Sequence, residues 1–271
     1  MCIEKIDSKQ FVAKLYNECV SKRNLPFAYW KHKALAMEGT AYSVKGRGCY
    51  YSVYGKFLSF CISDDGKCHI PARVLNDMDC IQLPASMYDG IKNNLSGFVP
   101  SCYHKLHYDF SYNSLRRETG DYLLEEFDFA CGRSFEEASA IISRGKNNWM
   151  KAENVRKITR EPVFTPDLWL FVKDVGNNRP IGIIISTYDS SVNETDIEWL
   201  YILPEYQGKG VGRLLIEETI KRSKENSSDI RAGGVNAFYR KCGFIEKEET
   251  VWAAKAGFSL VAPGIQPNLL P

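Results

Sequence analysis

Residues 200–216 read LYILPEYQGKGVGRLLI, a run that predicts a strand, a glycine-rich loop and a helix in direct succession. The segment from Ile197 to Leu203 is rich in β-forming side chains and is long enough for a buried strand. Pro204 has no N–H to donate to a neighbouring strand, so regular pairing should end there. From Gly210 onward, apolar residues recur at helical spacing. The run is therefore expected to place a loop between the end of a strand and the start of a helix.

The loop has glycine at three alternate positions, Gly208, Gly210 and Gly212. Glycine lets the backbone turn tightly and lets a ligand approach the main chain closely. A helix that starts just after such a loop offers unpaired N–H groups and the positive end of its dipole. Together these features predict a phosphate or diphosphate site, to which Lys209 and Arg213 would add positive charge.

Two common phosphate-binding motifs do not fit this loop. A P-loop requires G-x-x-x-x-G-K-[ST], whereas here the lysine precedes the second glycine and no Ser or Thr follows. A G-x-G-x-x-G fingerprint also fails, because its last position falls on Arg213 or on Leu215. The pattern that does fit is Gln207-x-x-Gly210-x-Gly212 between a strand and a helix.

This pattern resembles the Q/R-x-x-G-x-G/A pyrophosphate loop of the GCN5-related N-acetyltransferase (GNAT) family. Further along the chain, residues 238–244 read FYRKCGF and resemble the family's F-Y-x-K-x-G-F signature. The elements expected from residue 122 to residue 255 are a strand, two helices, three strands, a helix, a strand, a helix and a strand. This order is also similar to that of the family. The alternative is an ordinary strand-to-helix connection capped by glycines.

The resemblance implies that acetyl-CoA is the acyl donor and that its diphosphate lies on the glycine loop. It also implies that the strand before the loop splays from its neighbour and pairs through its main chain with the pantetheine arm. The expected cofactor-binding residues are Tyr201, Ile202, Leu203, Gln207, Gly208, Lys209, Gly210, Val211, Gly212 and Arg213.

The implied reaction moves the acetyl group to an amine, which must be neutral to attack the thioester. A lysine-like amine has a pKa of about 10.4, so only about one molecule in a thousand is neutral near pH 7.4. A general base must therefore remove a proton. Glu198 stands where many family members place a carboxylate, and strand alternation puts it on one face with Leu200 and Ile202. Asp196 and Glu194 are the weaker candidates, and a solvent-facing carboxylate is the plainer interpretation.

Tyr239 matches the tyrosine of the family's F-Y motif, which donates a proton to the departing CoA thiolate. The alternative is a tyrosine that only packs at a helix end. The family often has Asn seven residues earlier, but this chain has Ala232 there, and the nearest asparagine is Asn236. A contact between Asn236 and CoA is therefore left open.

The chain has 271 residues, of which 44% are apolar and 25% are charged, and its formal net charge is +2. These values are typical of a soluble globular protein and indicate neither a nucleic-acid-binding nor a membrane-binding surface. Residues 1–7 lack the apolar core of a signal peptide, and no run of about 18 apolar residues occurs. We therefore expect a cytoplasmic protein with one large or two modest domains.

The nine cysteines follow no disulfide framework, so reduced thiols are expected. Cys102, His104 and His107 are spaced like part of a metal cluster, but no second pair follows at zinc spacing. No metal is therefore expected.

Residues 111–121 are polar, include Gly120 and form the best candidate for a linker. They separate an N-terminal α/β domain, residues 1–120, from an acetyltransferase domain, residues 121–271. The first domain lies outside the resemblance. It is either a degenerate second copy of the fold or an unrelated cap over the substrate site.

Two local signals make specific predictions. Residues 64–67 (DDGK) predict a hairpin turn after a strand at 57–62, with a return strand at 68–74. Residues 134–137 (SFEE) form a capping box, which predicts a helix that starts at Phe135.

The expected fold is α/β, with a GNAT-like mixed central sheet flanked by helices and an additional N-terminal α/β domain. The expected function is acetyl-CoA-dependent N-acetylation of a primary amine. A non-catalytic acyl-CoA sensor on the same scaffold is the alternative. The sequence does not define the acceptor, exclude a longer acyl donor or set the oligomeric state.

Overall fold

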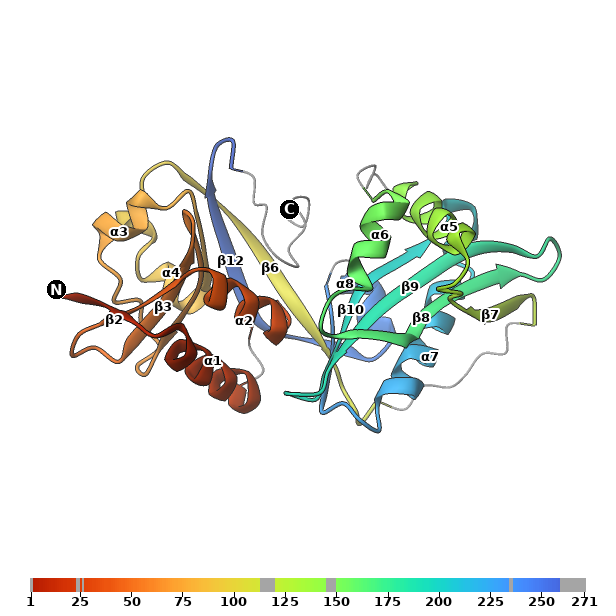
Figure 1. Cartoon of the computed structure of the whole chain (residues 1–271), viewed down its shortest axis with the longest axis horizontal. Helices are drawn as coiled ribbons and strands as arrows, with labels where there is room; N and C mark the ends of the chain where they lie inside the picture. The colour runs from red at the N-terminus through yellow and green to blue at the C-terminus, as the bar shows by residue number, and fades with distance from the viewer. Residues whose placement is uncertain are drawn as a thin grey trace. The chain divides into compact units, whose positions relative to one another are not determined.

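The computed structural model describes residues 2–22, 25, 27–112, 120–144, 150–233 and 236–258. The chain divides into two compact units, residues 1–105 with 247–271 and residues 106–246 (Figure 1). It passes from the first unit to the second within strand β6 (Phe98–Tyr108) and returns within β12 (Phe244–Lys255). The second unit therefore begins inside a strand, before the predicted linker. The assignment of domains to residues 1–120 and 121–271 stays a prediction.

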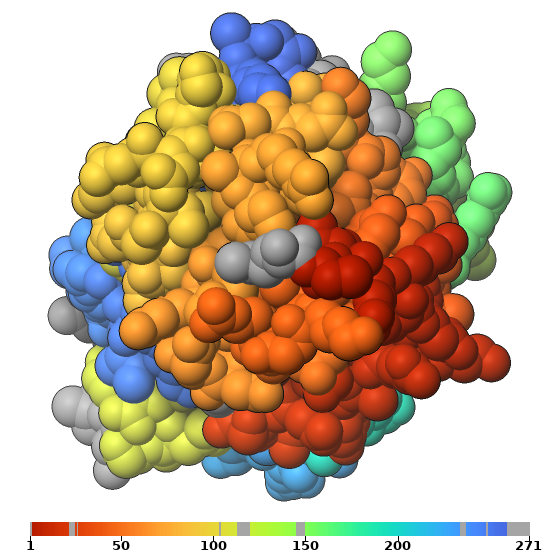
Figure 2. Space-filling view, turned by 90° about the vertical axis from the view of Figure 1, so that its left-hand side faces the viewer, coloured from red at the N-terminus to blue at the C-terminus, as the bar shows by residue number. Residues whose placement is uncertain are grey.

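The first unit contains two long helices and several short ones around a mixed sheet. Its elements are β1 (Ile3–Ile6), α1 (Ser8–Lys22), α2 (Tyr29–Glu38), β2 (Thr40–Val44), β3 (Cys49–Tyr54), β4 (Phe57–Ser63), α3 (Ala72–Asp77), β5 (Cys80–Pro84), α4 (Ala85–Asp89) and the 3-10 turn Lys92–Asn94. The strand order is β1-β2-β3-β4-β5-β12-β6. Figure 2 shows a face of this unit built mostly from the N-terminal residues, coloured red to yellow.

The second unit has the element order expected from the sequence. Its elements are β7 (Tyr122–Glu126), α5 (Gly132–Ser143), α6 (Ala152–Ile158), β8 (Phe164–Asp174), β9 (Arg179–Asp189), β10 (Glu194–Ile202), the 3-10 turn Pro204–Tyr206, α7 (Val211–Ser223), β11 (Asp229–Ala232) and α8 (Asn236–Lys241). The strand order, from the start of β12, is β12-β6-β11-β10-β9-β8-β7.

Alternation along the central strands creates a core on each face of the second sheet. Ile184 of β9 packs with α7 and α8, whereas its neighbours Ile183 and Ile185 pack with α5 and α6. All three side chains are fully buried. Strands covered on both faces read as continuous apolar runs, which explains why β9 lacks polar alternation. α5 and α6 lie on one face of the sheet and α7 lies on the other (Figure 1).

The predicted return strand at 68–74 is wrong. The chain turns after β4 and enters helix α3, which begins after Pro71. Proline fixes φ near the helical value and needs no N–H at a helix start, so it favours this short helix. The strand that follows is β5, and it runs parallel to β4 with Phe57 opposite Cys80.

The capping box at 134–137 is also wrong, because α5 begins three residues earlier, at Gly132. The Asp128 side chain accepts hydrogen bonds from the N–H groups of Ala130 and Cys131 at 3.0 and 3.2 Å. It therefore holds the turn before the helix. Most of the predicted linker, residues 113–119, lies outside the described residues.

Candidate functional site

The candidate site begins in the middle of β10, where an irregularity falls on Glu198. Ile197 pairs with Ser186 of β9 and Trp199 pairs with Ile185, so Glu198 is the extra residue of a β-bulge. The bulge interrupts alternation. Leu200 therefore packs on the same face as Ile197, whereas Trp199 packs with α5 and α6. Leu200 and Ile202 share one face as expected, and the placement of Glu198 on that face stays a prediction.

Above the bulge, β10 parts from β11. The parallel pairing runs from Glu194 opposite Asp229 to Ile197 opposite Ala232 and goes no further among the described residues. The antiparallel pairing with β9 continues to Ile202 opposite Gly182. Among the described residues, 198–202 therefore pair with β9 alone. Their other edge is open, because the pairing with β11 ends at Ile197.

Main-chain directions at the strand end follow from two hydrogen bonds. The N–H of Leu203 donates to the carbonyl of Ile181 at 2.8 Å, so Leu203 faces β9. The carbonyl of Ile202 instead accepts from Nε2 of Gln207 at 3.0 Å. Because main-chain groups of successive strand residues point to opposite edges, Ile202 presents its polar groups to the open edge. Tyr201 points toward β9 like Leu203.

The loop after Pro204 exposes its main chain. Gly208 and Gly210 have φ values of +76° and +87°, in the left-handed region that favours glycine. The N–H groups of residues 208–213 have no acceptor within the described part of the chain, and the first to donate is that of Leu214, to Gly210 at 3.1 Å. Residues 207–210 are exposed. This run of unpaired donors at the start of the thirteen-residue helix α7 matches the predicted anion site.

Gly212 brings the two sequence motifs together. A Cβ added there would lie 3.2 Å from Cζ of Phe238 in α8 and 3.5 Å from Cγ1 of Ile202. The end of β10, the start of α7 and the F-Y motif therefore meet at one point. Gly182 of β9 also permits a close approach of a neighbouring strand, since an added Cβ would lie 2.9 Å from the carbonyl oxygen of Tyr201. The sequence analysis did not identify Gly182, although a lone glycine inside a strand is a signal of close backbone approach.

The side chain of Tyr206 tethers the glycine loop to the β8–β9 turn, a contact that the sequence analysis did not predict. The hydroxyl of Tyr206 donates to Oδ2 of Asp174 at 2.8 Å, and Asn177 donates to that hydroxyl at 3.4 Å. The hydrogen bond from Tyr206 lowers the pKa of Asp174, and the same contact raises the pKa of Tyr206. Tyr206 lies in the quoted loop run, but its partner comes from a distant turn and leaves no local signal.

The two predicted cations of the loop have different surroundings. Arg213 donates from Nε to Oε1 of Glu217 at 2.7 Å, and this contact raises the pKa of Arg213. Its charge is therefore partly balanced within α7. Lys209 is exposed, and its Nζ lies 5.1 Å from the ring centroid of Tyr206. Lys209 is the cation better placed to meet an anion on the loop.

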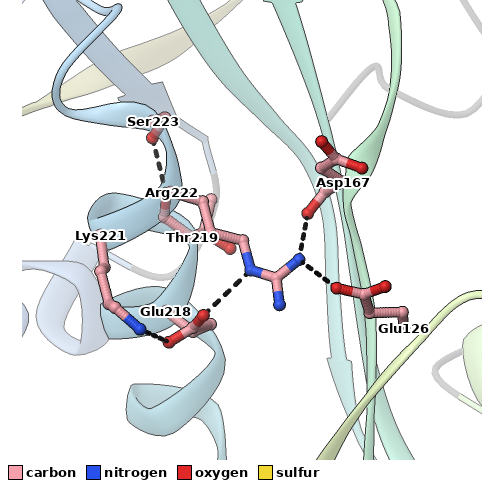
Figure 3. A network of polar contacts seen from close by, with 7 residues as sticks. All are labelled: Glu126, Asp167, Glu218, Thr219, Lys221, Arg222 and Ser223. Carbon is pink, nitrogen blue, oxygen red and sulfur yellow. Dashed lines mark hydrogen bonds and ion pairs between the residues drawn. The ribbon is translucent and has the colours of Figure 1, made fainter.

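The far end of α7 is fixed to the sheet by Arg222 (Figure 3). Its Nη1 donates to Glu126 of β7 at 3.0 Å and to the carbonyl of Asp167 in β8 at 2.9 Å, while its Nε donates to Glu218 at 3.0 Å. These bonds join one helix to two strands. They hold the axis of α7 and, with it, the loop at its other end.

Tyr239 is 5% exposed in α8, with ring centroids 5.2 Å from Phe238 and 5.3 Å from Phe244. It therefore packs in the core on the α7 side of the sheet, next to the residue that contacts Gly212. Glu198 is half-buried at its bulge. The side chain of Asn236 lies outside the described residues.

The weaker base candidates, Glu194 and Asp196, belong to a buried ionic cluster. Arg231 of β11 donates from Nη1 to Oε2 of Glu194 at 2.8 Å and stands opposite Asp196. In the same cluster, Nδ1 of His107 lies 2.9 Å from Asp229. All five residues are at most 3% exposed. Burial raises the pKa of Glu194. The cluster sits where β10 and β11 begin, away from the open edge.

The spacing of Cys102, His104 and His107 does not produce a common site. His104 lies 3.5 Å from Glu249, whereas His107 is buried against Asp229. No group of three or more metal-type ligands was found within the described residues. In that same part of the chain, no helix has both the length and the apolar content to span a membrane.

Comparison with known proteins agrees with this geometry. Residues 166–246 match the acetyltransferase (GNAT) domain family. The matched segment runs from β8 to the start of β12 and includes the bulge, the glycine loop and the F-Y motif. This segment of the second unit is thus similar to a GNAT acetyltransferase domain. No curated protein matches the chain in sequence.

Solved structures are similar over nearly the whole chain. A GCN5-related N-acetyltransferase from Sphaerobacter thermophilus has a TM-score of 0.66 at 12% identity and covers 94% of this chain and 95% of its own. A tandem GNAT protein from the clavulanic acid biosynthesis pathway has a TM-score of 0.61 at 10% identity and covers 96% and 99%. A GNAT-family acetyltransferase from Colwellia psychrerythraea has a TM-score of 0.59 at 9% identity and covers 94% and 100%. The fold is therefore that of GNAT proteins, across both units.

Proposed function

We propose that this protein is an acyl-CoA-dependent N-acetyltransferase that moves an acetyl group from acetyl-CoA to a primary amine. The observation that carries the proposal is the run of unpaired N–H groups at residues 208–213, next to the edge that β10 exposes above Glu198. Hydrogen bonds to charged acceptors contribute about 1.5–3 kcal/mol each, so a few of them suffice for a micromolar site.

The proposed cofactor contacts follow the strand and the loop. The diphosphate would accept from the N–H groups between Gly208 and Arg213, with Lys209 nearby. The pantetheine arm would pair with the open edge of β10, where Ile202 presents its main chain. The Ile202 carbonyl accepts from Gln207 at 3.0 Å, so Gln207 would have to release it or share it. Tyr201 and Leu203 would contribute side-chain contacts, because their main chains face β9.

Glu198 is the proposed general base. Glu198 is half-buried and is the extra residue of a bulge just beyond the last residue that pairs with β11, and a bulge can re-aim a side chain. The carboxylate would accept a proton from the acceptor ammonium, directly or through water. The neutral nitrogen would then attack the thioester carbon. Holding the two reactants in a productive orientation is worth about 7–11 kcal/mol.

Tyr239 is the proposed general acid. When the tetrahedral intermediate collapses, the carbon–sulfur bond breaks and the sulfur leaves with the electron pair. The Tyr239 hydroxyl would give its proton to that thiolate. Support comes from the packing of the neighbouring Phe238 on Gly212, which places the F-Y motif beside the glycine loop.

The alternative function is an acyl-CoA sensor without turnover. Such a protein would use the same loop and strand edge but would have no need for Glu198 or Tyr239.

In the proposed enzyme, the acceptor amine would contact α5 and α6, whether that acceptor is a small amine or a peptide.

The first experiment is a calorimetric titration of the full chain with acetyl-CoA, beside Gly210→Glu. The new carboxylate would repel the diphosphate and strain a backbone at φ +87°, so affinity is expected to fall at least about 100-fold. Gly257→Glu is the matched control. Its φ is +82° and a Cβ there meets open space, so it carries the same strain away from the loop. Equal affinity losses in both variants would contradict the proposed site.

Catalysis is then separated from binding with Glu198→Gln and Tyr239→Phe. Amines are screened by release of the CoA thiol. An enzyme should lose turnover by about 100-fold or more in either variant while it still binds acetyl-CoA. A chain that binds acetyl-CoA but shows no thiol release with any amine would instead favour the sensor.

A further inference from the structure

A short turn that follows β6 in the second unit is joined to the end of helix α8. The Asp109 carboxylate accepts from the N–H and the hydroxyl of Ser111 at 2.9 and 2.6 Å, and the Asp109 carbonyl accepts from the N–H of Tyr112 at 2.9 Å. These bonds fold residues 109–112 into a turn. The N–H of Asp109 donates to the carbonyl of Gly243 at 2.9 Å, which attaches the turn to the chain just after α8.

The side chain of Tyr112 covers the same end of α8. Its hydroxyl donates to the carbonyl of Lys241, the last residue of α8, at 3.2 Å. Its ring lies against Gly243, where an added Cβ would come within 2.5 Å of Cγ of Tyr112. Gly243 also has a φ of +89°, so its conformation and this contact both favour glycine. Tyr112 therefore satisfies one of the carbonyls that a helix leaves unpaired at its C-terminal end.

Tyr239 is connected to Tyr112 through main-chain and ring contacts. The N–H of Cys242 donates to the carbonyl of Tyr239 at 2.8 Å, so Tyr239 lies in the turn of α8 that Tyr112 covers. The Tyr239 ring meets Phe244 with centroids 5.3 Å apart, and Phe244 meets Tyr108 of β6 at 5.5 Å. The Tyr108 hydroxyl donates to the carbonyl of Tyr112 at 3.4 Å. Contacts therefore lead from Tyr239 back to Tyr112.

We propose that Tyr112 is a positioning residue for Tyr239. By holding the C-terminal end of α8, it fixes the direction in which the Tyr239 hydroxyl points toward the CoA sulfur. This role depends on the proposed function of Tyr239 as the general acid. Tyr112 lies outside the family match over residues 166–246 and outside the F-Y motif, so neither of them assigns it a role.

The test compares binding of CoA and of desulfo-CoA, in which hydrogen replaces the thiol, by calorimetric titration of the full chain near pH 8.5. A thiol like that of cysteine is about half ionised at this pH. Both ligands carry the same diphosphate and the same pantetheine amides, so the affinity for desulfo-CoA reports an intact site. The preference for CoA reports the hydrogen bond from Tyr239 to the sulfur. We expect the native chain to prefer CoA by about tenfold.

Three variants separate positioning from packing. Tyr239→Phe should abolish the preference for CoA. Tyr112→Ala should reduce that preference at least about threefold while it leaves the affinity for desulfo-CoA unchanged, because only the bond to the sulfur is misdirected. Tyr112→Phe keeps the ring on Gly243 and loses only the bond to Lys241, so its loss should be smaller, about twofold. Combining Tyr112→Ala with Tyr239→Phe should add nothing to Tyr239→Phe, because a positioning residue acts only through the group that it positions.

Tyr16→Ala is the matched control, because Tyr16 is 40% exposed and Tyr112 is 36% exposed, but Tyr16 lies in α1 of the first unit. It should leave both affinities unchanged. Far-UV circular dichroism establishes that each variant is folded, and Tyr112→Phe carries the test by itself if Tyr112→Ala is not.

The outcomes distinguish this inference from the proposals on which it depends. The positioning role is overturned if the folded Tyr112 variants keep the full preference for CoA, or if they lose affinity for both ligands equally. A native chain that binds both ligands without preference overturns the acid role of Tyr239 and, with it, the role of Tyr112. A native chain that binds neither ligand overturns the acyl-CoA proposal itself.

Discussion

The two units have the same order of elements but different chemistry at corresponding places. Each runs strand, two helices, three strands, helix, strand, helix, strand. In each, the fourth and fifth strands pair in parallel over a few residues and then part, beyond Leu58 in one and Ile197 in the other. In each, the fourth strand has an irregularity just beyond that residue, at Ser59 and at Glu198. We infer from this equivalence that the first unit is a second, degenerate copy of the fold.

The difference lies in the segment that follows the opened strand. In the second unit it is a glycine loop that leads into the thirteen-residue helix α7. In the first unit it is the turn 64–67, Cys68 and the six-residue helix α3, with no comparable row of glycines. A backbone can thus keep its strand geometry while the connection loses its anion site, because the strands are held by their cores and the site by a few loop residues.

A second difference lies where the parallel strands begin. The second unit has the charged residues Asp196 and Arg231 at the register positions where the first unit has Phe57 and Cys80. Phe57 stacks on Trp252 with centroids 5.3 Å apart, whereas Arg231 pairs with Glu194. One unit joins its strands there by apolar packing and the other by buried charges, which predicts different responses to mutation and pH.

The largest effect is expected for Arg231→Met. The variant leaves the Glu194 carboxylate buried without that guanidinium, so the free energy of unfolding should fall by about 3–5 kcal/mol. Urea denaturation measures the change. Arg133→Met is the control, because the Arg133 side chain is 80% exposed, and it should change stability little.

The pH dependence sharpens this prediction. Burial raises the pKa of Glu194 in the folded state. Such a carboxyl favours the protonated form there, so its contribution to stability grows as pH falls and is lost as pH rises through the folded pKa. The deficit of Arg231→Met should therefore shrink at acid pH. Phe57→Leu in the first unit should cost about 1–3 kcal/mol at every pH. If the loss in free energy of unfolding varied with pH in the same way for Arg231→Met and Phe57→Leu, the two units would not differ as proposed.

A smaller effect is expected for Tyr206→Phe, which cuts the tether between the glycine loop and Asp174. Loss of a hydrogen bond to a carboxylate should weaken acetyl-CoA binding by about tenfold, with little change in overall stability. Calorimetric titration measures the affinity. Asp65 holds the corresponding turn of the first unit by accepting from the Ser63 hydroxyl and the Lys67 N–H at 2.8 and 3.0 Å. Asp65→Asn therefore loosens that turn and should leave acetyl-CoA affinity unchanged. If it weakens binding as much as Tyr206→Phe does, the two turns do not differ in function as proposed.

The smallest effect is expected for Arg222→Gln, which removes the contacts that Arg222 itself makes in Figure 3. The guanidinium is partly exposed, so solvent screens its ion pairs, and the free energy of unfolding should fall by about 1 kcal/mol. Thermal denaturation followed by circular dichroism measures it. Lys157→Gln breaks an exposed pair within α6 and serves as the control. Identical melting curves for Arg222→Gln and the control would show that the clamp adds nothing to α7.

The sequence by itself determined the features that depend on neighbours along the chain. The apolar runs, Pro204 and the alternate glycines predicted the strand, the loop and helix α7, and residues 238–244 located the F-Y motif. These signals are local, because the backbone conformation of a glycine or a proline and the period of a helix are set within a few residues.

Tertiary structure alone decided the features that join distant residues. The bulge at Glu198 is defined by its register with β9, and the tether of Tyr206 by a turn about thirty residues earlier. The 3.7 Å approach of the Cys49 and Cys61 sulfur atoms is set by strand pairing between β3 and β4. Strand β6 likewise enters the second sheet by pairing with β11, which no periodicity within either strand reveals. Pairing partners and registers are chosen by the packing of whole faces, so the residues that meet there cannot be read from their spacing.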